Sequence, residues 1–163
     1  MAEGSRHLTG LVRKAYLLAC ACALGGFGCK KAPLVHPAEV RRVNADEIEI
    51  VPRPGAPPKC VAFSVSDQAV VRTLVMAEDL FSLDCPPGKP AALDGKPLYV
   101  PTNEGKARII VVFSDERLET ARIQNQVWDL RQKRDLGPRD IRVPEHAIAD
   151  VIAVDGDAPA ADR

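Results

Sequence analysis

Histidine, the side chain most often used as a general base or metal ligand, occurs three times in this 163-residue sequence, at His7, His36 and His146. Only His146 has acidic neighbours in the folded part of the chain, Glu145 and Asp150. A histidine beside carboxylates is the simplest form of a metal corner, or of a base held by an orienting acid. A lone histidine just before an apolar run is far more typical of a surface turn, so we expect no such role here.

The remaining chemistry-bearing residues form no recognisable constellation. The serines lack the G-x-S-x-G pattern of a hydrolase, and the sequence has no glycine-rich phosphate loop, no C-x-x-C and no H-E-x-x-H. The acidic pairs Glu78-Asp79 and Asp115-Glu116 lack the D-x-D-x-D-G spacing of a calcium loop. The sequence therefore predicts a protein that is not an enzyme, with no catalytic residues, no cofactor and no metal site.

One group of residues instead suits contact with another protein. Tryptophan and arginine are enriched at the energetic centres of protein interfaces, and the single tryptophan, Trp128, lies near Arg122 and Arg131. These three residues predict a partner contact if the indole is exposed. The alternative is a tryptophan buried in the core of a β-sandwich, which the sequence leaves equally open.

The first 28 residues differ from the rest and have the organisation of an export signal. The basic residues Arg6, Arg13 and Lys14 precede an uncharged run at 15–28 that ends in small residues. This order of a basic start, a short apolar stretch and a small-residue end predicts a signal peptide over 1–28. The run is shorter than the roughly 20 residues of a membrane-spanning helix. A short membrane anchor or a misassigned start is the alternative.

The end of this leader resembles that of bacterial lipoproteins, in which signal peptidase II cuts before a cysteine that carries diacylglycerol. Cys29 follows Gly26-Phe27-Gly28, and Cys20 follows Leu17-Leu18-Ala19, which fits the family's local pattern better. However, only five residues separate Cys20 from Lys14, fewer than the 7–15 apolar residues that a signal peptide needs. The resemblance therefore implies lipid attachment at Cys29.

A lipid-carrying Cys29 implies a membrane-held protein, because two or more acyl chains anchor stably. Lys30 stands where inner-membrane lipoproteins commonly have aspartate, which implies the outer membrane. The chain has 22 basic and 22 acidic residues, and the leader holds three and one of these, so 19 and 21 remain. A surface with a net charge of −2 offers no electrostatic footprint for nucleic acid.

The cysteines predict one disulfide. Cys20 and Cys22 belong to the leader and Cys29 carries the lipid, which leaves Cys60 and Cys85 as a pair in an oxidising compartment. Closing a loop of this length stabilises a fold by about 3 kcal/mol in the chain-entropy model. Two buried free thiols are the alternative.

Proline content suggests the domain boundaries. Residues 29–58 are predicted to form the lipid anchor and an extended tether, since 30–58 contains six prolines, although 46–51 alternates polar and apolar residues and suits an edge strand. Residues 59–155 are predicted to form one globular domain, and 156–163 a disordered tail. The prolines are Pro33, Pro37, Pro52, Pro54, Pro57 and Pro58.

Within 59–155, short runs rich in apolar and β-branched residues alternate with turn signals, which predicts several short strands. The runs are 59–65, 69–76, 98–100, 108–113 and 147–154. A helix over 67–81 competes with the second of them. The fold class predicted is mainly β, a small β-sandwich-like domain linked by one disulfide.

Residues 115–134 are ambiguous between helix and strand. Their composition favours a helix, but at 100° per residue Leu118, Ala121 and Trp128 lie opposite Ile123 and Val127. Alternation over 121–127 favours a strand, and the periodicity decides the prediction. An α+β fold, in which a helix at about 115–134 packs on a sheet, remains the alternative.

The lipoprotein-like leader and the absence of a catalytic or cofactor motif in the sequence together predict a non-enzymatic outer-membrane lipoprotein. We expect an accessory or structural subunit of an envelope machine for secretion, surface motility or adhesion, whose partners are the membrane, through the lipid anchor, and another envelope protein. A periplasmic lipoprotein that binds a small ligand, with the loop 82–97 forming the pocket, is the first alternative. A small hydrolase is the second, and it needs residues that the sequence lacks.

Overall fold

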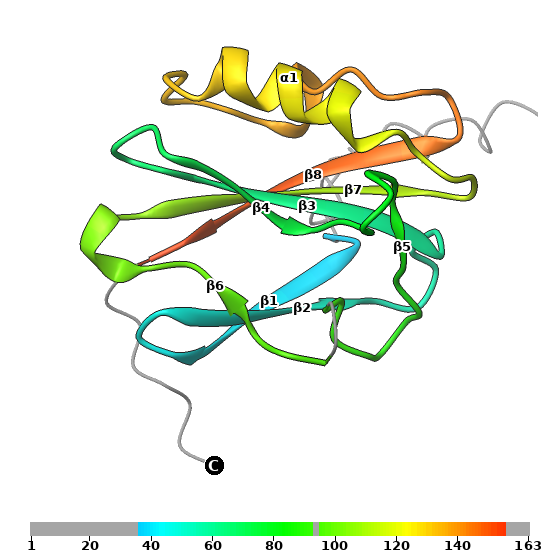
Figure 1. The fold of residues 1–163 in the computed structure, drawn as a ribbon, viewed down its shortest axis with the longest axis horizontal. Helices are drawn as coiled ribbons and strands as arrows, with labels where there is room; N and C mark the ends of the chain where they lie inside the picture. Colours follow the sequence, from blue (N-terminus) through cyan, green and yellow to red (C-terminus); the bar gives the residue numbers. More distant parts are fainter. Residues whose placement is uncertain (1–35, 93–94, 156–163) are drawn as a thin grey trace, which may run out of the picture. The chain divides into compact units, whose positions relative to one another are not determined.

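In the computed structural model, the described residues 36–92 and 95–155 form three layers, a helix on one β-sheet and a second sheet beneath it (Figure 1). No helix in these ranges is long and apolar enough to cross a membrane. The elements are β1 (Ala38–Asn44), β2 (Glu47–Pro52), β3 (Lys59–Ser66), β4 (Val71–Val75), β5 (Leu83–Asp84), β6 (Leu98–Tyr99), η1 (Thr102–Glu104), β7 (Ala107–Ser114), α1 (Thr120–Leu130), η2 (Pro138–Asp140) and β8 (Ala147–Val154).

Both sheets are antiparallel. The smaller sheet has the order β1-β2-β6, and the larger has the order β4-β3-β7-β8, with β5 pairing with β3. The β3–β7 and β7–β8 ladders each run over eight residue pairs without a register shift. The prediction of a mainly β fold with sandwich-like sheets is confirmed.

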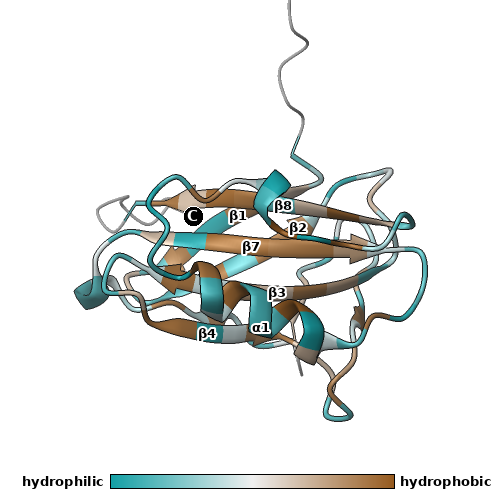
Figure 2. Cartoon of the chain, turned by 90° about the horizontal axis from the view of Figure 1, so that it is seen from above, coloured by the Kyte–Doolittle hydropathy of each residue, from teal (hydrophilic) through white to brown (hydrophobic). Residues whose placement is uncertain are grey.

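The central strands β3 and β7 are buried on both faces, which explains their nearly continuous apolar sequences. Side chains such as Phe113 point between the two sheets, and side chains such as Phe63 point toward the helix. Figure 2 shows this apolar character along both strands, beneath the helix. The fold therefore has two cores, one between the sheets and one under α1.

The segment predicted as a tether contains two strands, so the prediction that the folded domain starts at residue 59 is wrong. Strands β1 and β2 form a hairpin whose Ile48 and Ile50 are fully buried between the sheets. Within the described residues, Pro37 directly precedes β1, Pro52 ends β2, and the other prolines of this segment lie in the connection to β3, where a missing N–H costs no ladder bond. Proline content therefore marked the boundaries of these strands. The strand predicted at 46–51 is confirmed as β2, but it lies between β1 and β6 and so is not an edge strand.

The strand predicted over 121–127 is wrong, because this segment belongs to α1. Ile123 and Val127 are buried against the larger sheet, one turn apart, and Thr120 is buried at the start of the helix. Two residues blurred this pattern in the sequence. Leu118 lies before the helix, and Trp128 is exposed, so neither contributes to its buried face.

The predicted disulfide is confirmed. Cys60 in β3 bonds Cys85, which directly follows β5, and their Cα atoms are 5.7 Å apart. Both residues are fully buried in the core between the sheets. The strand predicted over 69–76 is confirmed as β4, in place of the competing helix over 67–81.

Three predictions concern parts of the chain that lie outside the described residues. These are the signal peptide over 1–28, lipid attachment at Cys29 and the disordered tail over 156–163.

Candidate functional site

The single tryptophan of the sequence lies exposed on α1. Trp128 is 45% exposed, although the preceding residue, Val127, is fully buried. The guanidinium of Arg131 lies 5.2 Å from the centre of the indole ring, and its Nη1 donates a hydrogen bond to the Trp128 carbonyl at 2.6 Å. A tryptophan stacked by an arginine and open to solvent is the type of anchor that protein interfaces use.

The end of α1 that carries Trp128 is held in place by β7. Arg108 donates hydrogen bonds to the carbonyl oxygens of Arg131, Lys133 and Arg134, at 3.5 Å for the first and 3.1 Å for the last. These oxygens follow the end of the helix, where backbone acceptors lack intrahelical partners. The indole therefore stands on a fixed element, which lowers the entropy that binding would cost.

The structure separates the three residues that the sequence grouped. Gln124, on the Trp128 flank, lies 3.5 Å from Thr73 of β4. Arg122 lies on the other flank and lines a cavity of about 860 Å³ between α1 and the connection to β8. Residues six apart on a helix point about 120° away from each other, so Trp128 and Arg122 cannot contact one partner group together. Trp128 and Arg131 remain the paired residues.

The residues that line the Arg122 cavity include charged side chains of both signs and apolar side chains. The Gln126 side-chain amide bonds both backbone groups of Arg142, donating at 3.0 Å and accepting at 2.8 Å, and so fixes the connection to the helix. His146 Nε2 lies 3.6 Å from Glu116 Oε2, and both side chains are solvent-accessible. This arrangement offers no nucleophile and no oriented acid–base pair.

Asp150 does not join His146. Its buried carboxylate is instead bonded by His36, whose Nδ1 lies 2.9 and 3.0 Å from the two oxygens, and by the Val151 N–H at 2.9 Å. The metal corner considered for His146, Glu145 and Asp150 is therefore not assembled. Among residues 36–92 and 95–155, no three His, Cys, Asp or Glu side chains are grouped to hold a metal ion.

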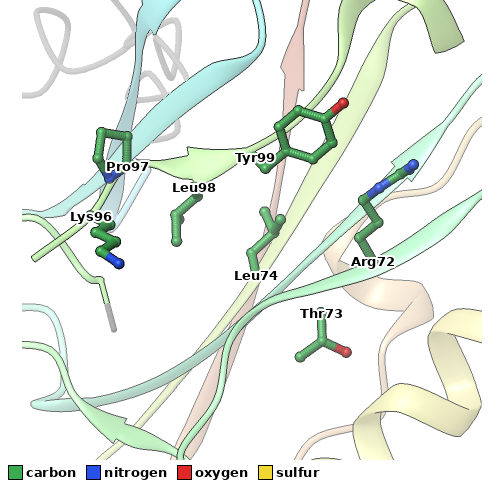
Figure 3. Close-up of a pocket in the computed structure, with 7 residues that line it drawn as sticks. All are labelled: Arg72, Thr73, Leu74, Lys96, Pro97, Leu98 and Tyr99. Atoms are coloured by element: carbon green, nitrogen blue, oxygen red, sulfur yellow. The ribbon is translucent and has the colours of Figure 1, made fainter. Parts of the chain in front are cut away.

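A second cavity, of about 470 Å³, opens between β4 and β6 (Figure 3). Arg72 is one of its lining residues, and the Arg72 guanidinium lies 6.0 Å from the Tyr99 ring centre. The same guanidinium makes two bonds to Glu104, of 2.5 and 2.6 Å, and these raise the pKa of Arg72. The lining residues are Arg72, Thr73, Leu74, Lys96, Pro97, Leu98 and Tyr99.

Tyr99 and Arg72 were not singled out from the sequence. Tyr99 follows a buried Leu98 and is 57% exposed, so the two-residue alternation of a strand was the available signal. Tyr99 contacts Arg72 of β4, which lies 27 residues earlier in the sequence. This contact depends on how the two sheets stack, because β4 and β6 belong to different sheets.

Comparison of the chain with protein-family models, with curated proteins and with solved structures finds no match. Functional inference therefore starts from the side chains described above.

Proposed function

We propose that this chain is a non-enzymatic lipoprotein of the outer membrane, which docks onto another envelope protein as an accessory or structural subunit. The observation that carries the proposal is the exposed Trp128, stacked by Arg131 on a helix end that Arg108 fixes. A rigid aromatic anchor of this kind supports protein contact. Enzymatic catalysis would instead need titratable side chains that point toward one another in a single site.

Lipid attachment at Cys29 would keep the start of the folded unit close to the bilayer. Strand β1 begins at Ala38, so few residues lie between the lipid and the folded unit. The seven residues 29–35 span at most about 25 Å when fully extended. The partner would accordingly be an envelope protein at the membrane surface, since the folded unit cannot reach far from it.

A pull-down of the full chain from detergent-solubilised membranes tests this function. We expect one protein partner in stoichiometric amount. The double variant Trp128→Ala, Arg131→Glu should weaken its binding by about 30-fold or more, because loss of an interface anchor commonly costs about 2 kcal/mol or more. Circular dichroism of the double variant serves as the folding control. Undiminished binding by a folded double variant would refute the docking role of Trp128.

A small-ligand-binding lipoprotein is the second candidate, and the cavity between β4 and β6 favours it. Lys96 and Pro97 line that cavity and belong to the loop 82–97 that the sequence marked for a pocket. Native mass spectrometry of the purified protein separates the two functions. A bound small molecule in place of a protein partner would favour the ligand binder.

A further inference from the structure

Strand β4 ends the larger sheet, so one side of its backbone has no neighbouring strand among residues 36–92 and 95–155. Its ladder with β3 is regular at Val71, Arg72 and Thr73, and the register shift lies beyond them. The Ser66 N–H bonds the Val70 carbonyl at 3.0 Å, which turns residue 70 toward β3. By the alternation of an antiparallel ladder, the backbone groups of Val71 and Thr73 point to the open side.

Each of the two elements that lie against β4, α1 on one face and β6 on the other, carries an exposed aromatic side chain, Trp128 and Tyr99 respectively. Thr73 faces the helix, where its hydroxyl lies 3.5 Å from Gln124, and Trp128 lies one turn further along that flank. Arg72 faces the other sheet and reaches the ring of Tyr99. Figure 3 shows Thr73 on one side of the strand, and Arg72 on the other with Tyr99. A strand added to β4 would have an aromatic ring on each face.

The charges around the edge indicate what kind of segment fits. Arg72 is neutralised by Glu104, whereas Arg131 and Lys96 have no carboxylate within ion-pair distance among the described residues. Both cations are therefore available to a carboxylate of a binding partner. A second copy of this chain, paired symmetrically through β4, would bring four such cations closer together, and their mutual repulsion would oppose this pairing.

We propose that β4 receives an extended acidic segment of a partner protein, which adds as a strand beside Val71–Thr73. Backbone hydrogen bonds to the open edge would supply part of the affinity. Alternate side chains would contact Trp128 and Tyr99, while carboxylates would face Arg131 and Lys96. This inference rests on the proposed docking function, because it names the partner segment and the strand that binds it.

The experiment uses a phage-displayed library of random nine-residue peptides, selected on the full chain in detergent. We expect enriched peptides in which acidic residues alternate with apolar ones. Their synthetic forms should bind Trp128→Ala and Tyr99→Ala at least about tenfold more weakly. Ile148→Ala, which removes an exposed apolar side chain from β8 at the opposite edge of the sheet, is the matched control and should bind within twofold.

Two further measurements address folding and binding mode. The charge reversal Lys96→Glu leaves the core intact, because this side chain is exposed, and should also weaken the acidic peptides. Hydrogen exchange of the complex should slow at the Val71 and Thr73 amides. The proposal would be overturned if no peptide is enriched, if the enriched peptides lack acidic residues, or if hydrogen exchange slows at β8 alone. A dimer formed through β4, detected by size-exclusion chromatography, would also overturn it.

The pull-down separates failure of this inference from failure of the docking function. A membrane partner that is lost with Trp128→Ala but retained with both Tyr99→Ala and Lys96→Glu would contradict the β4 strand and leave docking by α1 intact. A partner retained by all three folded variants would contradict both.

Discussion

Replacing His36 by alanine should destabilise the fold, although His36 lies 114 residues from its partner in the sequence. The His36 ring bonds both oxygens of the Asp150 carboxylate, and the Asp150 residue is 4% exposed. After the substitution, the Val151 N–H would be the only protein donor left to that carboxylate among the described residues. A buried carboxylate that loses a partner incurs part of its desolvation cost.

The size of the effect follows from the burial of the two partners. A hydrogen bond to a charged group contributes about 1.5–3 kcal/mol, and the lower end applies here because the His36 side chain is 48% exposed. We therefore expect a loss of about 1.5 kcal/mol in the free energy of unfolding. For a folded unit of this size, this corresponds to a fall in Tm of about 6 °C.

Urea unfolding of His36→Ala, Asp150→Ala and the double variant measures the coupling between the two side chains. The double variant should be more stable than the sum of the single effects predicts, by about 1 kcal/mol or more, because removing the carboxylate also removes the need for its partner. A coupling below about 0.3 kcal/mol, or a His36→Ala variant that melts with the wild type, would refute the reasoning.

Three further predictions use the cysteines and the last histidine. Replacing Cys60 and Cys85 by serine should lower the free energy of unfolding by about 3 kcal/mol, the cost of freeing a 25-residue loop, and an unchanged urea midpoint would contradict this. Intact mass of the mature protein should begin at an acylated Cys29, and palmitate-analogue labelling should disappear in Cys29→Ala; labelling that persists would indicate Cys20. His146→Ala should leave partner binding unchanged in the pull-down, whereas loss of activity in the folded variant would reveal a site that the docking proposal omits.

Much of the larger sheet could be predicted from the sequence, because its central strands are buried on both faces. The apolar residues of β3 and β7 are nearly unbroken, and the turn residues around them mark where each strand ends. The pairing of Cys60 with Cys85 followed from a count of cysteines. The strands depend on local composition and the disulfide on a small number of possible cysteine pairs. Both can therefore be predicted without knowing which residues are neighbours in the folded structure.

The smaller sheet and the helix could be predicted only in part. Strand β1 carries Arg41 and Arg42, and Ala38 is its one buried residue. Its sequence therefore lacks a strong strand signal, and its pairing with β2 is seen only in the structure. In α1, the exposed Trp128 disturbed the helical period. A large apolar residue enters a periodicity argument as if it were buried, and only packing against the larger sheet shows that it is not.

The candidate site was decided almost wholly by tertiary structure. Local sequence identified Trp128 and Arg131, because tryptophan and arginine are enriched at the energetic centres of protein interfaces. It could not show that Arg122 lies on the other flank of a packed helix, or that His36 forms the hydrogen bonds to Asp150 in place of His146. Nor could it place Tyr99 across β4 from the indole flank. Such neighbours are set by the order in which strands join and the faces on which layers stack, and both depend on contacts between residues far apart in the chain.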